Sequence, residues 1–532
     1  MEPQTAQLPV ADVMFDLRQK AGIAALKDLS AFSEYGGIRE RGHQGHRDAH
    51  GGVGGRDGGL RNGGPPRVPP RQGAPGALND RYDIPVVTFS RKSARGLFLT
   101  CLLVAGMLAW RTHATWGQRL YLPVVAGGLP LLAFRVFSWL MSWRDHPVKA
   151  GRSAQKALDR LNVVVTVPVY NEDPALLDRC LYALVNQSRP PQRVDVVDDG
   201  SKLDYTSVRD HWEGTWPGGL RVSWHRQVNQ GKRRAHAVTF ATSPEADIFV
   251  TVDSDTTLEH RALEEGLKPF RRRQVMSVAG IELGFNAYVN FLTRLETTLQ
   301  LFSQAVVGST WSVMGDMYTN RGPFALYRAA MVREIIPLYR DETFFGRRVI
   351  LGDDSLLSLC GSGRGKSVQQ LSAFGLTMFP ETLGHHMRQR IRWARGRAVR
   401  NFWRLRYYPL RSYIWWYTTI GIYSFLVALS ILAVVIATWP ASAPAAAHTL
   451  LAFYAWGCVN QLRVLCFRRS DESWLDRTFL VVLRPISGLW ASVVLSRLVR
   501  AYGTLTLLRQ GWTTRQQGAE LTFEPAHEEA AA

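Results

Sequence analysis

Three short runs rich in valine, each ending in polar side chains, stand out along the chain. The runs at 162–167, 194–197 and 249–252 have the length of buried strands. Four apolar residues recur at helical spacing between the first two runs: Leu177, Leu181, Leu184 and Val185. Pro174 precedes them and suits the first turn of a helix. The pattern predicts a strand, a helix and a second strand joined by a right-handed parallel crossover.

The polar residues that follow these strands are expected to meet. In open parallel sheets, ligands bind beyond the carboxyl ends of the strands. The polar residues at the three strand ends are Tyr170, Glu172, Asp198, Asp199, Asp253 and Asp255. We expect these side chains along one edge of the sheet. Asp253 and Asp255 can hold a divalent metal against a nucleoside diphosphate, although two acids after a strand also occur as a helix cap or a solvated turn.

Two apolar segments precede the predicted strands. Residues 96–110 are short for a full membrane span, whereas residues 120–143 are long enough despite Arg135. We predict two transmembrane helices within residues 93–145. Two buried helices of a soluble domain would give the same pattern.

Further apolar segments predict membrane helices within residues 419–503. Residues 420–439 and 450–466 are two candidates, and 479–498 is a third, interrupted by an Arg-Pro pair and therefore a kinked span or a re-entrant element. The link at 440–448 has no Lys or Arg, while two arginines follow the second candidate. The positive-inside rule then places the link outside the cell and the catalytic region in the cytoplasm.

Four segments have a different character. Residues 1–92 include a stretch of Gly, Arg, Pro and His with few aliphatic residues, which predicts a disordered cytoplasmic tail. Residues 401–418 mix arginines with Trp and Tyr and predict a helix at the head-group boundary. Residues 288–306 carry an apolar stripe at helical spacing, with Arg294 and Glu296 elsewhere on the helix, and predict either a second interface helix or a plain core helix. Residues 504–532 form a predicted cytoplasmic tail.

Composition narrows the class of protein. The chain has 532 residues, 46% of them hydrophobic, and a formal net charge of +20. This charge suits contact with anionic lipids and anionic substrates. It would also suit nucleic acid, but no helix-turn-helix, zinc-finger or RNA-binding signature accompanies it, so we exclude a nucleic acid partner. The five cysteines have no paired spacing for zinc or for a disulfide framework.

The ordered motifs from about residue 162 to residue 515 resemble the family 2 glycosyltransferases, specifically the processive hyaluronan, chitin and cellulose synthases. The matching segments are 168–172, 198–201, the basic loop 229–235, 252–256, 322–328, Gly352-Asp353-Asp354, Gln389-Arg390-Ile391-Arg392-Trp393 and Gly511-Trp512-Thr513-Thr514-Arg515. The resemblance implies an α/β fold: a cytoplasmic GT-A-type domain with a mixed, mainly parallel sheet at 155–400, fused to a transmembrane helix bundle. It also implies a multi-pass protein of the cell membrane.

The resemblance implies a role for each matched residue. Residues expected to bind a UDP-sugar or the growing polysaccharide are Tyr170, Glu172, Asp198, Asp199, Lys232, Arg233, Asp253, Gln389, Arg392 and Trp393. Asp253 and Asp255 would hold Mg²⁺ or Mn²⁺ on the diphosphate. In the motif Asp353-Asp354, Asp354 would be the general base of an inverting transfer; alone, this motif would be read as a helix cap.

Four residues depart from the hyaluronan synthase pattern and leave the sugar open: Arg321, Ser355, Arg390 and Thr513. The favoured interpretation is a membrane-integral hyaluronan synthase that uses UDP-N-acetylglucosamine and UDP-glucuronate. A chitin-type synthase using one UDP-sugar is the alternative within the same class. A non-catalytic membrane protein that binds or exports polysaccharide is the alternative from another class. The sequence leaves polymer length and oligomeric state open.

Overall fold

The computed structural model describes residues 82, 84–91, 121–437, 454 and 456–509. Several predicted segments therefore lie outside the described residues. They are almost all of the tail 1–92, the apolar segment 96–110, the link 440–448 and the element 511–515.

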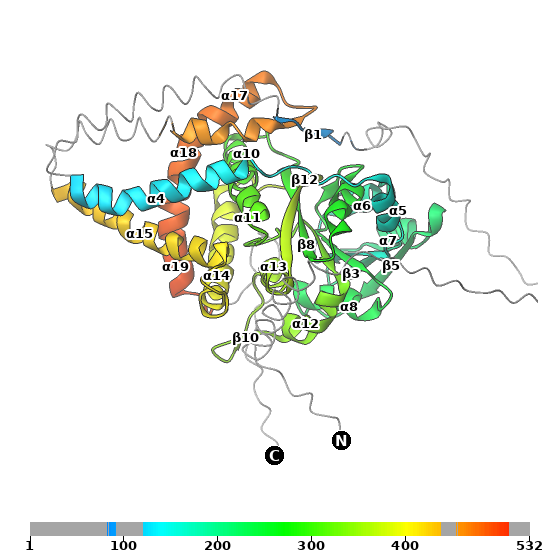
Figure 1. Cartoon of the computed structure of the whole chain (residues 1–532). Helices are drawn as coiled ribbons and strands as arrows, with labels where there is room; N and C mark the ends of the chain where they lie inside the picture. The colour runs from blue at the N-terminus through cyan, green and yellow to red at the C-terminus, as the bar shows by residue number, and fades with distance from the viewer. Residues whose placement is uncertain (1–81, 83, 92–120, 438–453, 455, 510–532) are drawn as a thin grey trace, which may run out of the picture.

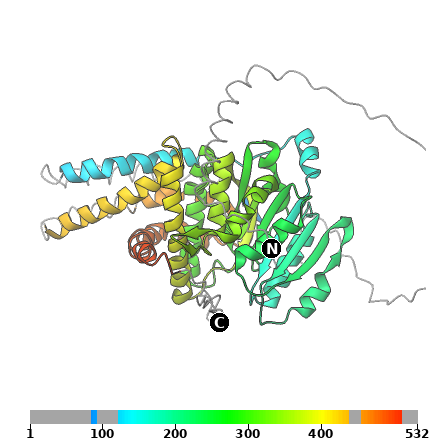
Figure 2. The same ribbon diagram turned by 90° about the horizontal axis from the view of Figure 1, so that it is seen from below.

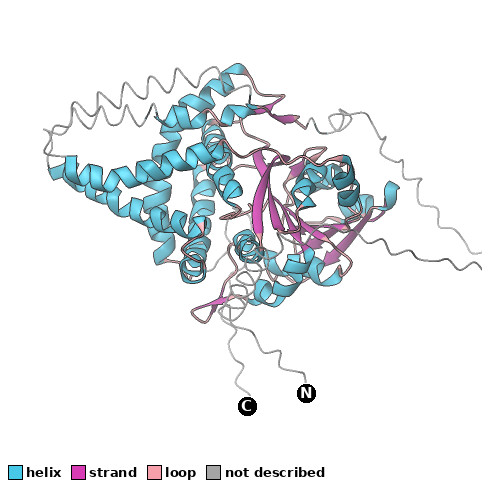
Figure 3. Cartoon of the chain, in the orientation of Figure 1, coloured by secondary structure: helices cyan, strands magenta, loops and turns pink. Residues whose placement is uncertain are grey.

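A nine-stranded sheet forms the centre of the molecule (Figure 3, magenta). Its order is β4 (Gly214–Thr215), β5 (Arg221–Arg226), β3 (Arg193–Asp198), β2 (Val163–Val169), β6 (Ile248–Val252), β9 (Phe324–Arg328), β8 (Val275–Gly284), β12 (Lys366–Thr377) and β7 (Thr257–Leu258). Strands β4, β7 and β9 run against their neighbours, and the other six run in one direction. The predicted α/β class with a mixed sheet is confirmed.

The predicted crossover is present between β2 and β3. Helix α6 (Pro174–Val185) connects these two parallel strands, and Pro174 occupies its first turn. The Asp173 side chain caps the helix by accepting a hydrogen bond from the Ala175 backbone N–H at 2.8 Å. The ends of β2, β3 and β6 consequently reach the same edge of the sheet.

Helices cover both faces of the sheet (Figure 1). One face packs against α6, α7 (Thr206–Trp212) and α9 (Ala262–Leu267), and the other against α8 (Lys232–Thr242), α12 (Ala329–Asp341) and α13 (Asp353–Arg364). Strand β2 shows the alternation: Val163 and Val165 join the first core, and Val164 joins the second. Both faces are apolar, as expected for a sheet covered on two sides.

Gly280 in β8 is a point of close packing. A Cβ atom at this position would lie 2.1 Å from Cδ1 of Phe324 on the neighbouring strand. We expect Gly280→Ala to lower the free energy of unfolding by about 1 to 3 kcal/mol, because the core must shift to admit the methyl group. Gly151→Ala is the control, since nothing lies within 4 Å of its added Cβ. Denaturant unfolding of both variants measures the difference, and equal stabilities would contradict the packing.

A helical part lies beside the sheet (Figure 1, left). It comprises α4 (Tyr121–Ser142), α10 (Phe291–Phe302), the π-helical turn η6 (Ser303–Gly308), α11 (Ser309–Met314), α14 (Leu383–Tyr407), α15 (Tyr413–Ala437), α17 (Trp474–Val482), α18 (Arg484–Leu489), the π-helical stretch η8 (Trp490–Val499) and α19 (Arg500–Leu505). Figure 2 shows α4 and α15 projecting side by side away from the sheet.

Smaller elements complete the fold. Strand β1 (Val87–Phe89) pairs with β13 (Phe467–Arg469), and β10 (Thr343–Phe344) pairs with β11 (Arg347–Arg348). The remaining pieces are α5 (Arg152–Asp159), η4 (Pro217–Gly219), η5 (Lys268–Arg271) and η7 (Val464–Cys466). The β1–β13 pair ties the chain before α4 to the chain before α17.

The described residues contain no unbroken helix with both the length and the apolar composition needed to cross a bilayer. Helix α17 and the run Arg484–Leu505 meet that requirement together, with a bend of 42° between them. The bend falls at the predicted Arg-Pro interruption. The predicted transmembrane bundle is therefore not confirmed by the helices, and it stays a prediction.

The structure differs from the prediction at both predicted interface helices. The segment 401–418 is not one helix, because α14 ends at Tyr407 and α15 begins at Tyr413. Pro409 lies in the turn between them and disfavours a continuous helix. In α10, Phe291 is 60% exposed, whereas Glu296 is 1% exposed. The apolar pattern did not predict the burial of Glu296, because this burial depends on the ion pair with Arg390 from another helix.

Candidate active site

The strand ends open into a cavity of about 1,820 Å³ that extends between the sheet and the helical part. Eleven predicted site residues line it: Tyr170, Glu172, Asp199, Lys232, Asp253, Asp255, Asp353, Asp354, Gln389, Arg392 and Trp393. They come from β-strand ends, from the starts of α8 and α13, and from one side of α14. Two predicted site residues, Asp198 and Arg233, do not line the cavity.

Asp253 and Asp255 follow β6 and present oxygen ligands to the cavity. Asp253 Oδ1 lies 2.5 Å from Lys232 Nζ, and Asp255 Oδ1 accepts a hydrogen bond from Thr377 Oγ1 at 3.1 Å. No group of three His, Cys, Asp or Glu side chains among the described residues could hold a metal by itself. Two carboxylates fit Mg²⁺ or Mn²⁺ when the substrate phosphates supply further ligands. The donor set is therefore suited to a metal that arrives with its nucleotide.

Lys232 stands at the first turn of α8, between two carboxylates. Its Nζ lies 2.5 Å from Asp253 Oδ1 and 3.5 Å from Asp353 Oδ2. Burial would lower the pKa of Lys232, but attraction by Asp253 and Asp353 outweighs burial and raises this pKa. A Cβ on Gly322 would lie 3.3 Å from the same Nζ, so the 322–323 turn closes tightly over the ammonium. Lys232 thus carries a fixed positive charge beside Asp253 and Asp353.

Asp199 holds the basic loop in place. Its carboxylate accepts hydrogen bonds from the backbone N–H groups of Gln230 at 2.9 Å and Gly231 at 2.7 Å, and from Gln227 Nε2 at 2.6 Å. Burial raises the pKa of Asp199 against the opposing effect of these hydrogen bonds. Asp198, only 2% exposed, accepts a hydrogen bond from the Ser201 N–H at 2.8 Å and shapes the turn after β3. Its predicted contact with substrate does not fit this inward position.

Asp353 and Asp354 begin α13 and have opposite electrostatic surroundings. Burial and the charge of Asp353 raise the pKa of Asp354, although Thr319 Oγ1 donates a hydrogen bond to it at 2.8 Å. Burial also acts to raise the pKa of Asp353, but Lys232 lowers it well below its usual range. Gly352, with φ of 70°, occupies the cap position, so neither carboxylate serves as the helix cap. Both residues line the cavity, and Asp354 Oδ1 also accepts a hydrogen bond from the Ser355 backbone N–H at 2.7 Å.

The Arg233 side chain points away from the expected diphosphate position. It is 2% exposed; its Nη1 lies 2.7 Å from Glu342 Oε2, and its Nη2 donates to the Leu351 carbonyl at 2.5 Å. Arg400 of α14 pairs with the same carboxylate and reaches the Gly352 carbonyl at 3.4 Å. This network binds α8, α14 and the segment before Asp353 to one another. Arg233 is therefore a positioning residue.

Helix α14 presents its predicted residues to the cavity. Gln389, Arg392 and Trp393 share one side of the helix, and Thr382 caps its start by accepting a hydrogen bond from the His385 N–H at 3.4 Å. The Arg390 guanidinium lies over the Trp393 ring, 4.5 Å from its centroid. This contact fixes one face of the indole beside the cavity.

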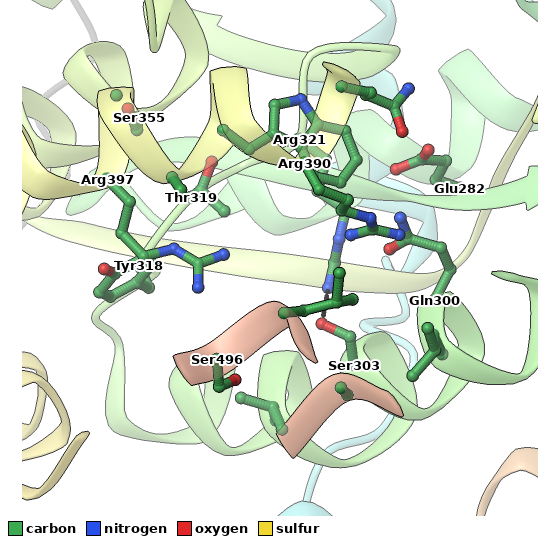
Figure 4. Close-up of a pocket in the computed structure, with 18 of the residues that line it drawn as sticks. Glu282, Gln300, Ser303, Tyr318, Thr319, Arg321, Ser355, Arg390, Arg397 and Ser496 are labelled. Carbon is green, nitrogen blue, oxygen red and sulfur yellow. Dashed lines mark hydrogen bonds between the residues drawn. The ribbon is translucent and has the colours of Figure 1, made fainter. Parts of the chain in front are cut away.

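Several cavity residues had no role in the sequence interpretation. Figure 4 shows Glu282, Gln300, Ser303, Thr319, Arg321 and Arg390 around one part of the cavity. Arg321 and Arg390 were noted only as departures from a pattern. Glu282 and Gln300 lie in a strand and a helix that otherwise read as core, so no local signal marked them.

Part of the chain is similar to known proteins. Residues 164–335 match the model of glycosyl transferase family 2. The hyaluronan synthase of Streptococcus pyogenes is 32% identical over 269 residues, which cover 50% of this chain and 62% of that protein. The N-acetylglucosaminyltransferase of Rhizobium meliloti is 29% identical over 245 residues, covering 44% of this chain and 55% of that protein. The chain thus spans less than two thirds of these relatives.

A structural comparison gives a weaker match. A mannosyltransferase of Pyrobaculum calidifontis, solved with GDP-Man and Mn²⁺, covers 69% of this chain and 97% of its own at a TM-score of 0.45 and 18% identity. This similarity is too low to support a functional inference.

Proposed function

We infer that this chain, whose residues 164–335 match the model of glycosyl transferase family 2, is a membrane-integral processive enzyme that polymerises UDP-sugars. The favoured product is hyaluronan, made from UDP-N-acetylglucosamine and UDP-glucuronate. One observation carries the proposal: the strand-end carboxylates, Lys232, Asp354 and Trp393 line the same cavity although they are distant in sequence.

In this proposal the donor lies along the strand ends. Tyr170, Glu172 and Asp199 face the uridine side of the cavity, and Asp253 with Asp255 would hold Mg²⁺ or Mn²⁺ on the diphosphate. The bound metal would neutralise the charge of the departing UDP. Lys232 and Arg392 add fixed positive charge at the same place.

Asp354 is the proposed general base. The acceptor hydroxyl loses its proton to the Asp354 carboxylate while its oxygen forms a bond to the anomeric carbon of the donor. The bond from that carbon to the diphosphate oxygen breaks, and UDP leaves with the electron pair. Because attack and departure occur on opposite sides of the carbon, the configuration inverts. The flat face of Trp393 would hold the acceptor sugar ring in line for this attack.

The membrane part of the proposal has separate support. The net charge is +20, and α17, α18 and η8 expose several large apolar side chains: Leu475, Phe479, Val482, Ile486, Leu489 and Val493. Such a surface suits lipid contact. The cavity continues from Asp354 to α18 and η8, so a growing polysaccharide could leave along these helices. The catalytic domain would then face the cytoplasm.

UDP release from purified membranes tests the function. The full chain is supplied with Mg²⁺ and single UDP-sugars, and then with pairs of them. Release that requires both UDP-N-acetylglucosamine and UDP-glucuronate supports the hyaluronan proposal. Release with UDP-N-acetylglucosamine alone supports the chitin-type alternative, and no release with any donor supports a non-catalytic binding or export protein.

Asp255→Asn tests the metal position. The substitution removes a charged ligand while leaving the amide able to accept the hydrogen bond from Thr377. We expect UDP release to fall by about 100-fold or more at low Mg²⁺, with partial recovery as Mg²⁺ or Mn²⁺ is raised. Asp210→Asn, at an aspartate with a 64% exposed side chain, is the control. An Asp255→Asn enzyme with unchanged metal dependence would remove Asp255 from the metal site.

Asp353→Asn tests whether the charge of Asp353 raises the pKa of the proposed base, Asp354. A general base works when deprotonated, so activity rises as pH increases through its pKa. Asp353 helps to raise the pKa of Asp354 by like-charge repulsion, and Lys232 opposes that rise. Removing the Asp353 charge should therefore move the acid limb of the kcat profile to lower pH. A shift to higher pH would contradict the arrangement.

A further inference from the structure

Arg321 is held in an unfavourable backbone conformation at the cavity wall. Its φ is 57°, in the left-handed region that non-glycine residues rarely adopt. The residue is 8% exposed and lines the cavity next to Gly322, which packs against Lys232. Strain of this kind persists where surrounding structure enforces it, and it is concentrated at functional sites.

Only part of the Arg321 guanidinium has a hydrogen-bond partner. Its Nη2 donates a hydrogen bond to Ser303 Oγ at 3.0 Å (Figure 4). Its Nη1 is buried and has no hydrogen-bond partner, and Arg321 has no ion pair with a described carboxylate. Burial lowers the pKa of Arg321 to about 10, which leaves the side chain charged at neutral pH. A buried cation with a vacant donor is costly unless a ligand completes it.

The neighbouring carboxylates do not accept a hydrogen bond from Arg321 Nη1. Glu296 Oε1 is taken by Arg390 and by Gln300, whose Nε2 donates to it at 2.8 Å, and Glu296 Oε2 lies 3.4 Å from His386 Nδ1. Glu282 is the charged group that acts most strongly on Arg321, yet burial raises the pKa of Glu282 to about 7. Arg321 thus has no carboxylate within ion-pair distance among the described residues, and Glu282 offsets its charge only in part.

The position of Arg321 corresponds to the acceptor side of the proposed reaction. Asp354, the proposed base, is among the few charged groups that influence its guanidinium. Ser303, its partner, begins the π-helical turn η6, a local helix distortion that is common at functional sites. The donor diphosphate would lie on the other side of Gly322, at Lys232 and Asp253.

We propose that Arg321 binds the carboxylate of a uronic acid unit at the end of the growing polysaccharide. The proposal rests on the function proposed above. A guanidinium matches the planar geometry of a carboxylate and can donate two parallel hydrogen bonds to it. Nη1, which is buried in this structure, would supply one of them once the side chain turns toward the cavity, and the carboxylate would neutralise the buried charge. Arg321 would thereby distinguish uronic acid ends from neutral sugar ends.

Two matched oligosaccharides test this assignment. Both alternate N-acetylglucosamine with glucuronate, but one ends in glucuronate at its non-reducing end and the other in glucose. Calorimetric titration uses the full chain in detergent with UDP and Mg²⁺. We expect the wild-type chain to bind the glucuronate-ended molecule about 10- to 100-fold more tightly. Arg321→Gln should bind both equally, Arg321→Lys should keep part of the preference, and the exposed Arg273→Gln should behave as wild type.

The outcomes separate this inference from the proposed function. A wild-type chain that binds both oligosaccharides equally, or an Arg321→Gln chain that keeps the preference, overturns the role of Arg321. If the wild-type chain in that case still releases UDP with both donors, the proposed function stands without a role for Arg321. If the wild-type chain releases no UDP with any donor, but its preference for the glucuronate end is abolished by Arg321→Gln, the carboxylate site is supported and the transferase function is contradicted.

Discussion

Asp354→Asn is expected to slow sugar transfer by about 100- to 10,000-fold, while the folded structure and UDP binding stay intact. The amide keeps the size of the side chain and can still accept the hydrogen bond from Thr319 Oγ1, which lies 2.8 Å from Asp354 Oδ2. It cannot take a proton from the acceptor hydroxyl. In the proposed function, binding of UDP depends on the strand ends and on Lys232, so the substitution should separate binding from chemistry.

Single-turnover UDP release and UDP titration together measure this separation. The exposed Asp210→Asn variant controls for the general effect of losing one carboxylate. An Asp354→Asn chain that turns over within about threefold of wild type would show that another group takes the proton. Loss of UDP binding in the same variant would show that Asp354 acts in binding rather than as a base.

Glu342→Gln is expected to lower the free energy of unfolding by about 3 to 5 kcal/mol, because it leaves two buried arginines without a counter-charge. Arg233 is 2% exposed and Arg400 is 0% exposed, and both depend on this carboxylate. The same arginines donate to the carbonyls of Leu351 and Gly352 just before Asp353. We therefore expect transfer to fall together with stability.

Glu334→Gln is the matched control for this prediction. Glu334 also pairs with an arginine, Arg364, but its side chain is 51% exposed. Exposed pairs of this kind contribute about 0 to 1 kcal/mol. Denaturant unfolding of the two variants gives the comparison. Equal stabilities for Glu342→Gln and Glu334→Gln would contradict a structural role for the buried network.

Much of the fold around the site was predictable because periodicity and strand-end chemistry are local signals. The runs that become β2, β3 and β6 are buried on both faces and therefore read as continuous apolar segments. The other half of the sheet was not predicted strand by strand. Its order depends on β9 running between β6 and β8, a long-range pairing that no local pattern encodes.

The site was predictable at the level of segments and less so at the level of single side chains. Lys232 and Arg233 are adjacent in α8, but a helix turns about 100° per residue. One side chain therefore faces the cavity while the other enters the core. Asp198 and Asp199 differ in the same way at the end of β3, where successive residues point in opposite directions. Which member of each pair faces the ligand depends on packing.

Buried charges explain the remaining differences. Glu296 was expected on a polar face of its helix, yet it lies in the interior with Arg390 and His386. Glu342 and Arg400 form a similar pair across 58 residues of sequence. Charged residues enter the interior when partners from distant segments offset their desolvation. A single sequence does not identify these partners.

A density map of the full chain with UDP and Mn²⁺ tests the central claim most directly. The account predicts nucleotide density along the ends of β2, β3 and β6, with the metal and diphosphate between Asp253, Asp255 and Lys232, and with Asp354 and Trp393 across the same cavity. Nucleotide bound elsewhere, or a diphosphate remote from Asp253 and Asp354, would contradict it.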